Sequence, residues 1–201
     1  MGSALSTAIA LVTSTDINAY LGITVGGTEE IQTDLLINAA SQLALTWTGR
    51  TTLISASLTE TYPGDNTQTL LTYSYPISAV SQVYIDVAGK FDGTSGYIAD
   101  STTYNFQTRG RIVLIGGAFL AGIADTDSVQ IKYTAGYSTI PYDLQEAIKE
   151  LVMYWYRRKV DVRVGKLSET AGNTSTVYES DIPVAVSTVL NRYRNFMRRV
   201  M

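Results

Sequence analysis

Apolar residues recur at helical spacing in four stretches of this 201-residue chain. Positions three and four apart lie on one face of an α-helix, so this spacing predicts amphipathic helices. The predicted helices cover about residues 14–21, 28–48, 141–159 and 182–199. The second helix has a long apolar stripe, formed by Ile31, Leu35, Leu36, Ala39, Leu43 and Trp47. We therefore expect this stripe to face a helical core.

The third predicted helix carries clear signals at both of its ends. Leu144, Ile148 and Leu151 fall on one face. Pro141 suits the first turn of a helix, and Asp143 lies near the positive end of the helix dipole. An Arg-Arg-Lys run lies at the other end, where cations are favoured. This pattern predicts the principal core helix.

Residues 51–134 lose the helical period and gain β-branched and aromatic residues. Segments such as "PGDN", "FDGTSG" and "TRG" interrupt them, and these residue types are typical of turns. The segment "TYNFQTRGRIVL" predicts a hairpin that turns near Arg109 and Gly110. The predicted fold class is therefore α+β, a bundle of about four helices with an antiparallel β section inserted between the second and third helices.

A polar stretch at about residues 160–180 has no periodicity and is rich in Gly, Ser and Thr. Loops of this length are uncommon in compact domains unless they are functional or disordered. We expect a flexible loop here, followed by a last helix that ends in arginines. Because no repeat and no second domain is evident, residues 1–201 are predicted to form a single domain.

Composition excludes several kinds of chemistry. The chain has no His and no Cys, so it lacks the commonest general base, the usual transition-metal ligand and the thiol nucleophile. Asp125 and Asp127 form an Asp-x-Asp pair, which turn residues explain better than a cation site does. The P-loop pattern fails because Leu167 follows Gly165 and Lys166, where Ser or Thr is needed. We expect no catalytic residues, no cofactor and no metal.

Charge is distributed unevenly along the chain. Residues 149–201 hold ten of the fifteen Lys and Arg residues against five acids, whereas residues 1–148 hold five bases against thirteen acids. Such a split suits head-to-tail contacts between subunits or contact with an anionic partner. The net charge of -3 argues against a dedicated nucleic-acid binder. No run reaches the roughly 20 apolar residues of a membrane span, so no membrane partner is expected.

The fourteen tyrosines leave two interpretations open. Tyrosines on a sheet suit a carbohydrate-binding platform, but Tyr is also an ordinary strand former and a favoured interface residue. The tyrosines considered for this platform are Tyr62, Tyr73, Tyr75, Tyr84, Tyr97, Tyr104, Tyr133 and Tyr137.

Two segments, "TSTDINAYLGI" and "LLINAASQLALTWTGR", lie before the β section, and Gly49 and Arg50 stand at the end of the second one. The β section closes on the pattern "Y-x-x-G-Y … P-x-D-L-x-x-A". Its residues in this chain are Tyr133, Gly136, Tyr137, Pro141, Asp143, Leu144 and Ala147. These motifs resemble those of tailed-bacteriophage head–tail connector (adaptor) proteins, in which a helix pair precedes a β section that closes on this signature. The resemblance covers most of the chain, and its motifs are structural.

The resemblance implies a structural virion protein of the phage neck, made in the bacterial host cytoplasm. Family members form a ring beneath the portal protein, expected in twelve copies. The ring extends the DNA channel and provides a platform for the stopper or tail-completion protein, and non-specific contact with the DNA stays open. The alternatives are another neck or tail-completion component and a Tyr-rich carbohydrate-binding β module, with a carboxylate hydrolase as a more distant third.

The resemblance also implies that the carboxy-terminal helix and the nearby loop reach toward the portal. The candidate residues for contact with the portal or the DNA channel are Arg192, Arg194, Arg198, Arg199, Tyr193, Arg163 and Lys166. The alternative is a terminal helix that packs on its own domain and leaves its arginines exposed. At the junction, we expect Gly136 and Pro141 to turn the chain from sheet into helix.

Overall fold

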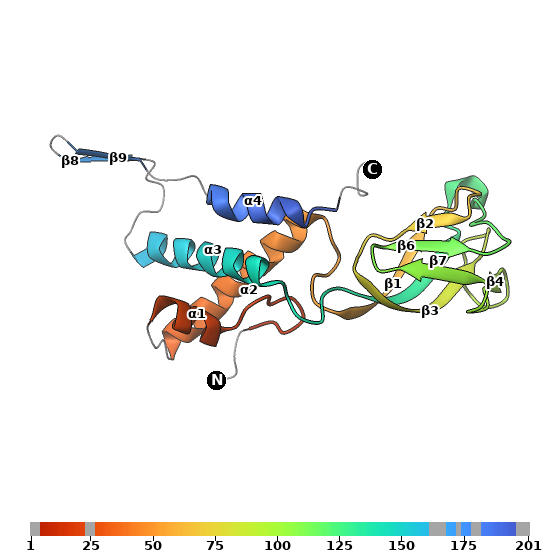
Figure 1. The fold of residues 1–201 in the computed structure, drawn as a ribbon, viewed down its shortest axis with the longest axis horizontal. Helices are drawn as coiled ribbons and strands as arrows, with labels where there is room; N and C mark the ends of the chain where they lie inside the picture. Colours follow the sequence, from red (N-terminus) through yellow and green to blue (C-terminus); the bar gives the residue numbers. More distant parts are fainter. Residues whose placement is uncertain (1–4, 23–26, 161–167, 172–173, 178–181, 196–201) are drawn as a thin grey trace. The chain divides into compact units, whose positions relative to one another are not determined.

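The computed structural model describes residues 5–22, 27–160, 168–171, 174–177 and 182–195 (Figure 1). The chain divides into two compact units. A helical unit comprises residues 1–49 and 140–194, and a β unit comprises residues 50–139 and 195–201. The chain therefore passes from one unit to the other three times. That residues 1–201 act as a single domain stays a prediction.

The described residues of the helical unit form four helices and a two-stranded ribbon. These elements are α1 (Ser14–Leu21), α2 (Thr28–Thr48), α3 (Tyr142–Val160), β8 (Ser168–Ala171), β9 (Thr174–Val177) and α4 (Val184–Arg192). α3 packs against the three other helices. Leu144, Ile148 and Leu151 of α3 are fully enclosed, which confirms the predicted core face of this helix.

Capping residues set the ends of the first two helices. The Thr13 hydroxyl accepts from the Asp16 backbone N–H, and the Asp16 carboxylate accepts from the Thr13 N–H, which completes a capping box before α1. Gly22 and Gly49 follow α1 and α2 in the left-handed conformation, each with a φ of 65°. These ends agree with the predicted helix boundaries.

α4 is shorter than predicted. It ends at Arg192, and the backbone N–H groups of Tyr193 and Arg194 donate to carbonyls three residues earlier, a tightened last turn that closes the helix. The last residues of the predicted helix, from 196 onward, lie outside the described residues.

α2 buries a different face from the one that its apolar stripe predicts. Leu35 is 56% exposed and Ala39 is exposed as well. The buried positions are Thr33, Asp34, Ile37, Ala40, Ser41, Ala44, Leu45 and Thr48. Most of these side chains are small or carry a hydroxyl, and Thr48 satisfies its hydroxyl by donating to the Ala44 carbonyl at 2.7 Å. Close approach of the neighbouring helices therefore sets the buried face, and hydrophobicity alone does not.

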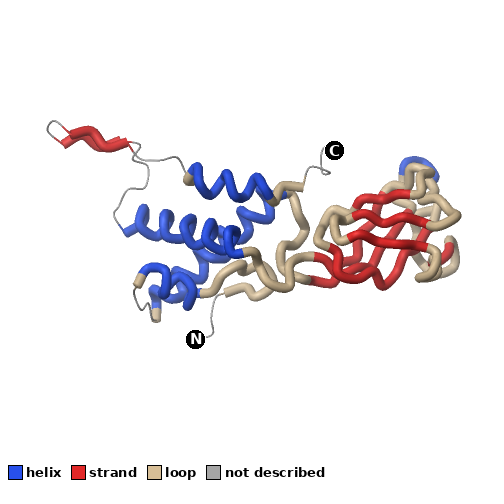
Figure 2. Tube along the Cα trace, in the orientation of Figure 1, coloured by secondary structure: helices blue, strands red, loops and turns tan. Residues whose placement is uncertain are grey.

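The β unit contains two antiparallel sheets, and Figure 2 shows its strands as a group. Its elements are β1 (Ala56–Tyr62), β2 (Thr69–Leu71), β3 (Ile77–Ile85), β4 (Tyr97–Ile98), β5 (Tyr104–Gln107), β6 (Arg111–Leu114), the 3-10 helix η1 (Ile123–Asp125) and β7 (Val129–Ala135). The larger sheet has the order β1-β7-β3-β4 and the smaller one β2-β6-β5. The hairpin predicted near Arg109 and Gly110 is confirmed by the β5–β6 pair, in which Gln107 lies opposite Arg111.

Alternating side chains from the two sheets enclose the core of the β unit. Along β7, Val129, Ile131 and Tyr133 are buried, whereas Lys132 between them is exposed. This period of two directs one face of the strand to the core and the other to solvent. Ile112 on β6, which has no exposed surface, belongs to the same core.

The predicted flexible loop at about residues 160–180 needs a correction. Its residues 168–171 and 174–177 form the antiparallel pair β8–β9, with Ser168 opposite Val177. The apolar–polar alternation that predicts strands is missing here, although the Gly172 and Asn173 pair between them is a hairpin signal. The rest of the predicted loop lies outside the described residues.

The predicted α+β class is confirmed, with a β section inserted between α2 and α3. The section runs from residue 56 to residue 135, close to the predicted bounds. Among the residues that the structure describes, no helix combines the length and the apolar character needed to cross a membrane.

Candidate assembly sites

The strand-to-helix junction is shaped by Gly136. Its φ of +106° lies in a region that side-chain-bearing residues rarely adopt, and a Cβ here would lie 2.2 Å from the carbonyl oxygen of Ile54. The next residue, Tyr137, donates its N–H to the Leu53 carbonyl and accepts from the Ser55 N–H. Glycine is therefore required where the two chain segments meet.

Tyr133, the first residue of the signature, belongs to a buried cluster around the Glu60 carboxylate. The hydroxyls of Tyr62 and Tyr133 both donate to Glu60 Oε2, Tyr62 at 2.5 Å. Thr51 donates to Glu60 Oε1 at 2.8 Å. Only 3% of Tyr62 and 1% of Tyr133 are exposed. The cluster thus links side chains of β1 and β7 across the two paired strands.

Burial raises the pKa of both phenols above their ordinary value of about 10. The proximity of Tyr133 raises the pKa of Tyr62 further, and the hydrogen bonds to Glu60 raise both because they require the phenol proton. Both side chains are therefore neutral donors at physiological pH. This chemistry suits a structural role and no nucleophilic one.

Arg50 is 4% exposed and lies among aromatic rings of the β unit. Its guanidinium carbon lies 3.6 Å from the centroid of the Tyr75 ring and 5.8 Å from that of the Tyr137 ring. Its Nη1 donates to the Tyr75 carbonyl at 2.9 Å, and its Nε has no hydrogen-bond partner among the described residues. These cation–π contacts hold two tyrosines around a buried charge. Arg50 thus acts as a structural residue in the junction.

Asp143 connects the start of α3 with the end of α4. The Tyr193 hydroxyl donates to Asp143 Oδ1 at 2.5 Å, and Arg192 Nη1 lies 4.0 Å from Asp143 Oδ2. The neighbouring signature residues Leu144 and Ala147 are buried in the helical core. A signature residue and two candidate partner residues are therefore brought into one cluster.

The described residues cover only part of the set of candidates for partner contact. The side chain of Arg192 is 66% exposed, Arg194 is exposed and Tyr193 is half-buried. This helix end therefore presents basic groups to solvent. The other candidates, Arg163, Lys166, Arg198 and Arg199, lie outside the described residues.

Within the described part of the chain, no group of three or more acidic side chains is arranged to hold a metal ion. Asp125 ends η1, and Asp127 accepts from the Thr61 hydroxyl at 2.7 Å. Both lie in the connection between β6 and β7, which agrees with their interpretation as turn residues.

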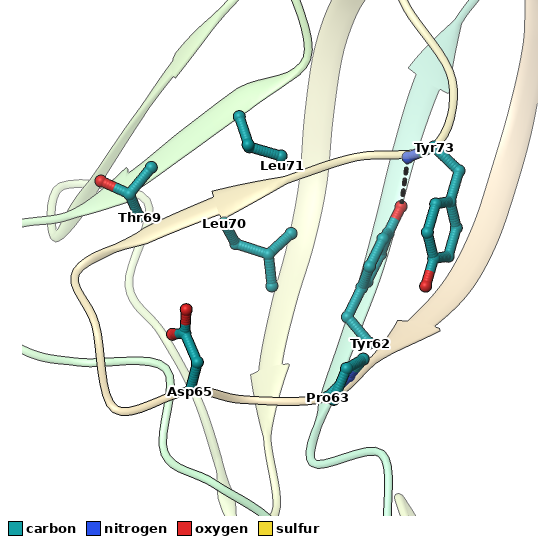
Figure 3. Close-up of a pocket in the computed structure, with 7 residues that line it drawn as sticks. All are labelled: Tyr62, Pro63, Asp65, Thr69, Leu70, Leu71 and Tyr73. Carbon is teal, nitrogen blue, oxygen red and sulfur yellow. Dashed lines mark hydrogen bonds between the residues drawn. The ribbon is translucent and has the colours of Figure 1, made fainter. Parts of the chain in front are cut away.

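A pocket of about 230 Å³ lies beside the end of β1 (Figure 3). It is lined by Tyr62, Pro63, Asp65, Thr69, Leu70, Leu71 and Tyr73. The rings of Tyr62 and Tyr73 stack with their centroids 4.7 Å apart, and the Tyr73 N–H donates to the Tyr62 hydroxyl at 3.2 Å. Figure 3 shows Leu70 pointing from β2 into the space above Pro63 and Asp65.

The tyrosines considered for a carbohydrate platform are mostly inside the β unit. Tyr62, Tyr84, Tyr104 and Tyr133 are buried, and Tyr73, Tyr75 and Tyr137 are half-buried. Of these eight described tyrosines, Tyr97 alone is exposed, at 50%. They form a core and supply hydrogen bonds, and they do not form a flat aromatic surface.

Sequence reasoning missed the roles of Glu60, Thr51 and Asn195. Asn195 is buried and its side-chain amide donates to the Tyr73 carbonyl at 2.6 Å. Tyr133 lies 73 residues from Glu60, and Tyr73 lies 122 residues from Asn195, so no local pattern marks these two contacts. Tyr62 and Thr51 lie nearer to Glu60, but they form no recognisable motif with it.

Comparison with known protein families connects this fold to an assembly role. The family model described as "Head completion protein" matches residues 10–196, nearly the whole chain. The chain belongs to the head completion protein family. The sequence resemblance to phage head–tail connector proteins is thereby confirmed at the level of the family. No curated protein matches this head completion protein.

Solved structures that share the fold come from the gene transfer agent (GTA) particle. A chain from the neck of the empty GTA particle, computed with C6 symmetry, aligns with a TM-score of 0.63 at 17% identity, covering 100% of this chain and 98% of that chain. A chain from the virion of the native particle gives 0.62 at 17%, covering 100% and 96%. One from the native neck, computed with C12 symmetry, gives 0.61 at 18%, covering 100% and 98%. At such identities the likeness shows a common fold.

Proposed function

We propose that this head completion protein is a structural component of the neck of a tailed phage-like particle. The observation that carries the proposal is the family match over residues 10–196. The fold shared with chains from GTA necks supports the same location. The protein forms a ring beneath the portal, extends the DNA channel and provides the attachment platform for the stopper or tail. No catalysis is needed for this role.

Twelve copies are the proposed number in the virion. The native GTA neck was computed with C12 symmetry, which supports this number for a protein of the same fold. An uneven charge distribution suits the heterologous contacts that close such a ring, because each subunit presents unlike surfaces to its two neighbours. The ring therefore uses different faces of one chain.

The exposed arginines at the end of α4 are proposed to contact portal acids or the phosphates of DNA in the channel. Arg192 and Arg194 are exposed, and the hydrogen bond from Tyr193 to Asp143 holds the segment between them against α3. Guanidinium groups bind carboxylates and phosphates in the same bidentate geometry. The anchored segment thus offers two cations at a defined place in the helical unit.

The test of the assembly role is negative-stain imaging with native mass spectrometry, on the chain alone and with the portal protein of the same particle. Rings with an open channel are expected, alone at high micromolar concentration or on the portal as template. A chain that stays unassembled alone and does not bind the portal contradicts the proposal.

The test of the arginines is the double substitution Arg192→Glu and Arg194→Glu. Portal binding should weaken at least about tenfold, or 1.4 kcal/mol, with a larger loss at low salt. The double substitution Arg109→Glu and Arg111→Glu, at two exposed positions of the β5–β6 hairpin, changes the net charge by the same amount; it serves as the charge-matched control and should bind normally. If the variant with both Arg192→Glu and Arg194→Glu binds the portal as tightly as the natural protein does, these two arginines do not contact the portal.

A further inference from the structure

Three connections of the β unit leave its larger sheet at the same end. The pairing of β1, β7, β3 and β4 places the end residues of these strands in one row, formed by Tyr62, Val129, Ile85 and Tyr97. The connections that leave this row cover residues 63–68, 86–96 and 115–128, and the third includes η1. Together they form the loop end of the β unit.

Hydrogen bonds fix these connections to one another. The Ile123 N–H donates to the Val87 carbonyl at 2.8 Å, which joins the third connection to the second. The Asn66 N–H donates to the Phe119 carbonyl at 2.8 Å, and Asn66 Oδ1 accepts from the Ala121 N–H at 3.1 Å, which joins the third connection to the first. The loop end therefore holds its side chains at defined positions.

The third connection leaves large apolar side chains exposed. Ile115, Leu120 and Ile123 are 56%, 40% and 65% exposed, whereas Phe119 among them has no exposed surface. Figure 2 draws η1, which begins with Ile123, as a blue turn at the margin of the β unit. Single exposed apolar residues are ordinary, but several of them in one ordered loop with polar residues around them are typical of a protein interaction site.

Acidic side chains flank these apolar residues. The aspartates of the loop end that reach the surface are Asp65, Asp92, Asp125 and Asp127. Lys90 is the only basic residue in the three connections. Asp65 lies near Leu120, because the next residue, Asn66, is bonded to both sequence neighbours of Leu120. Asp125 ends η1, so acidic groups lie on both sides of the apolar residues.

Two of these carboxylates are held in the ionised form by their own loops. The Thr67 hydroxyl donates to Asp65 and lowers the pKa of that carboxyl below its ordinary value. The hydroxyl and the N–H of Thr94 donate to Asp92 and lower its pKa in the same way. The loop end therefore has a net negative charge at neutral pH.

We propose that the loop end docks into a second neck protein, at a surface where Lys or Arg side chains surround an apolar depression. Ile123 and Leu120 supply the apolar centre of the contact, and the aspartates around them pair with the basic rim. An apolar centre with a polar rim is the usual anatomy of a protein interface, and charges at the rim guide association. This inference rests on the proposed function and names the surface of its attachment platform.

The sign of the charge selects this occupant. The loop end repels DNA phosphates and acidic protein surfaces, because like charges brought together cost free energy. Arg192 and Arg194 have the opposite charge, belong to the helical unit and are proposed to bind those acidic partners. The loop end therefore needs a partner of different chemistry, and a basic surface on the next neck protein meets this requirement.

The first test measures how tightly the stopper or tail-completion protein of the same particle binds to rings assembled on the portal. Ile123→Ser should weaken this binding at least about tenfold, because it removes the most exposed apolar side chain of the loop end. Val184→Ser is the matched control, since Val184 is also 65% exposed but lies on α4, and it should bind normally. Circular dichroism should show both variants folded, because neither side chain is buried.

A second test neutralises the acidic rim. Asp92→Asn together with Asp125→Asn removes two negative charges and keeps oxygen acceptors of the same shape. The association rate should fall at least about threefold at low salt, and the difference should shrink at high salt, because salt screens the attraction. Glu29→Gln together with Glu30→Gln, at two exposed positions in the first turn of α2, changes the net charge by the same amount and should leave the rate unchanged.

Normal binding by Ile123→Ser, or a normal association rate for the Asp92 and Asp125 variant, would overturn the inference and leave the proposed function standing. Loss of ring formation by Ile123→Ser in the absence of the stopper would show that the loop end contacts a neighbouring copy, which also overturns it. A natural chain that neither forms rings nor binds the portal would instead refute the proposed function. Natural rings that bind no stopper or tail-completion protein would refute both the attachment platform and its location.

Discussion

Gly136 combines two constraints that act at a single residue. Its φ is +106°, and an added Cβ would lie 2.2 Å from the Ile54 carbonyl oxygen, a backbone atom that cannot rotate away. We expect Gly136→Ala to lower the free energy of unfolding by on the order of 3 kcal/mol or more, from strain plus displacement of the backbone. Urea unfolding followed by circular dichroism measures this change.

Gly116→Ala provides the control for backbone strain alone. Gly116 has a φ of +73°, but an added Cβ would have no atom within 4 Å. Its substitution should cost about 1 kcal/mol, the ordinary penalty for a left-handed residue. Equal losses from the two variants would mean that close approach at Gly136 contributes nothing.

Tyr62 links residue chemistry to pH. Burial raises its pKa and that of Tyr133, so both phenols keep their protons in the folded state at pH values where an unfolded tyrosine ionises. Their stabilising contribution is complete below the unfolded value of about 10 and is lost as pH rises above it toward the folded value. We therefore expect stability to fall with pH above about 10, measured as the urea midpoint across this range.

Tyr62→Phe should flatten that pH dependence. The variant loses the hydrogen bond that the Tyr62 hydroxyl donates to Glu60 and the one that it accepts from the Tyr73 N–H, at a cost of about 1 to 3 kcal/mol at neutral pH. Tyr142→Phe, at a position that is 79% exposed, should change neither quantity. If the urea midpoint of the Tyr62→Phe variant falls with pH as steeply as that of the natural protein, other groups cause the loss of stability at alkaline pH.

At the scale of single elements, the sequence predicts where the helices begin and end, but it does not predict which strands pair with each other. Helical spacing, Pro141 and the glycines after α1 and α2 are local signals, and they placed the helix ends within one or two residues except at α4. The pairing of β1 with β7 depends on contacts such as Ala56 with Ala135, which lie far apart along the chain. No local pattern encodes such a contact. The buried face of α2 also depends on its neighbours, which is why Leu35 is exposed.

The residues of the candidate assembly sites also differ in whether the sequence alone identifies them. The signature residues Tyr133 and Gly136 were identifiable from their motif, but the Glu60 carboxylate that accepts the hydrogen bond of the Tyr133 hydroxyl was not. Glu60 is an ordinary acidic residue in a polar strand sequence, and only the folded sheet brings the Tyr133 phenol to it.

The contact between α3 and α4 yields a prediction for one element. Asp143→Ala removes the acceptor of the Tyr193 hydroxyl and the acidic group beside Arg192. Hydrogen exchange at the carboxy-terminal end of α4 should become roughly fivefold faster, about 1 kcal/mol, while the buried Leu144 keeps α3 folded. Ser187→Ala, whose hydroxyl donates to a carbonyl within α4, is the control. Uniform acceleration over all helices would instead show global destabilisation.

On the scale of the whole molecule, the β unit is almost continuous in sequence. Residues 50–139 supply it, with a short addition from residue 195 onward, while the helical unit is assembled from both sides of this insertion. The ends of the insertion lie side by side, because Tyr137 exchanges backbone hydrogen bonds with Leu53 and Ser55. Insertions with adjacent ends can fold without their host, since closure of the chain costs little entropy.

We therefore expect residues 50–139 to fold as an isolated fragment. Their core has its own buried residues, among them Ile112, Ile131 and Tyr133, and both sheets lie within the fragment. Omitting Asn195 removes one hydrogen bond to the Tyr73 carbonyl, a loss of about 1 kcal/mol. A dispersed amide NMR spectrum and a cooperative urea transition are the expected results, and the fragment should retain an alkaline loss of stability through Tyr62. An unfolded fragment would mean that the two units stabilise each other, and the prediction of one domain over residues 1–201 would then hold.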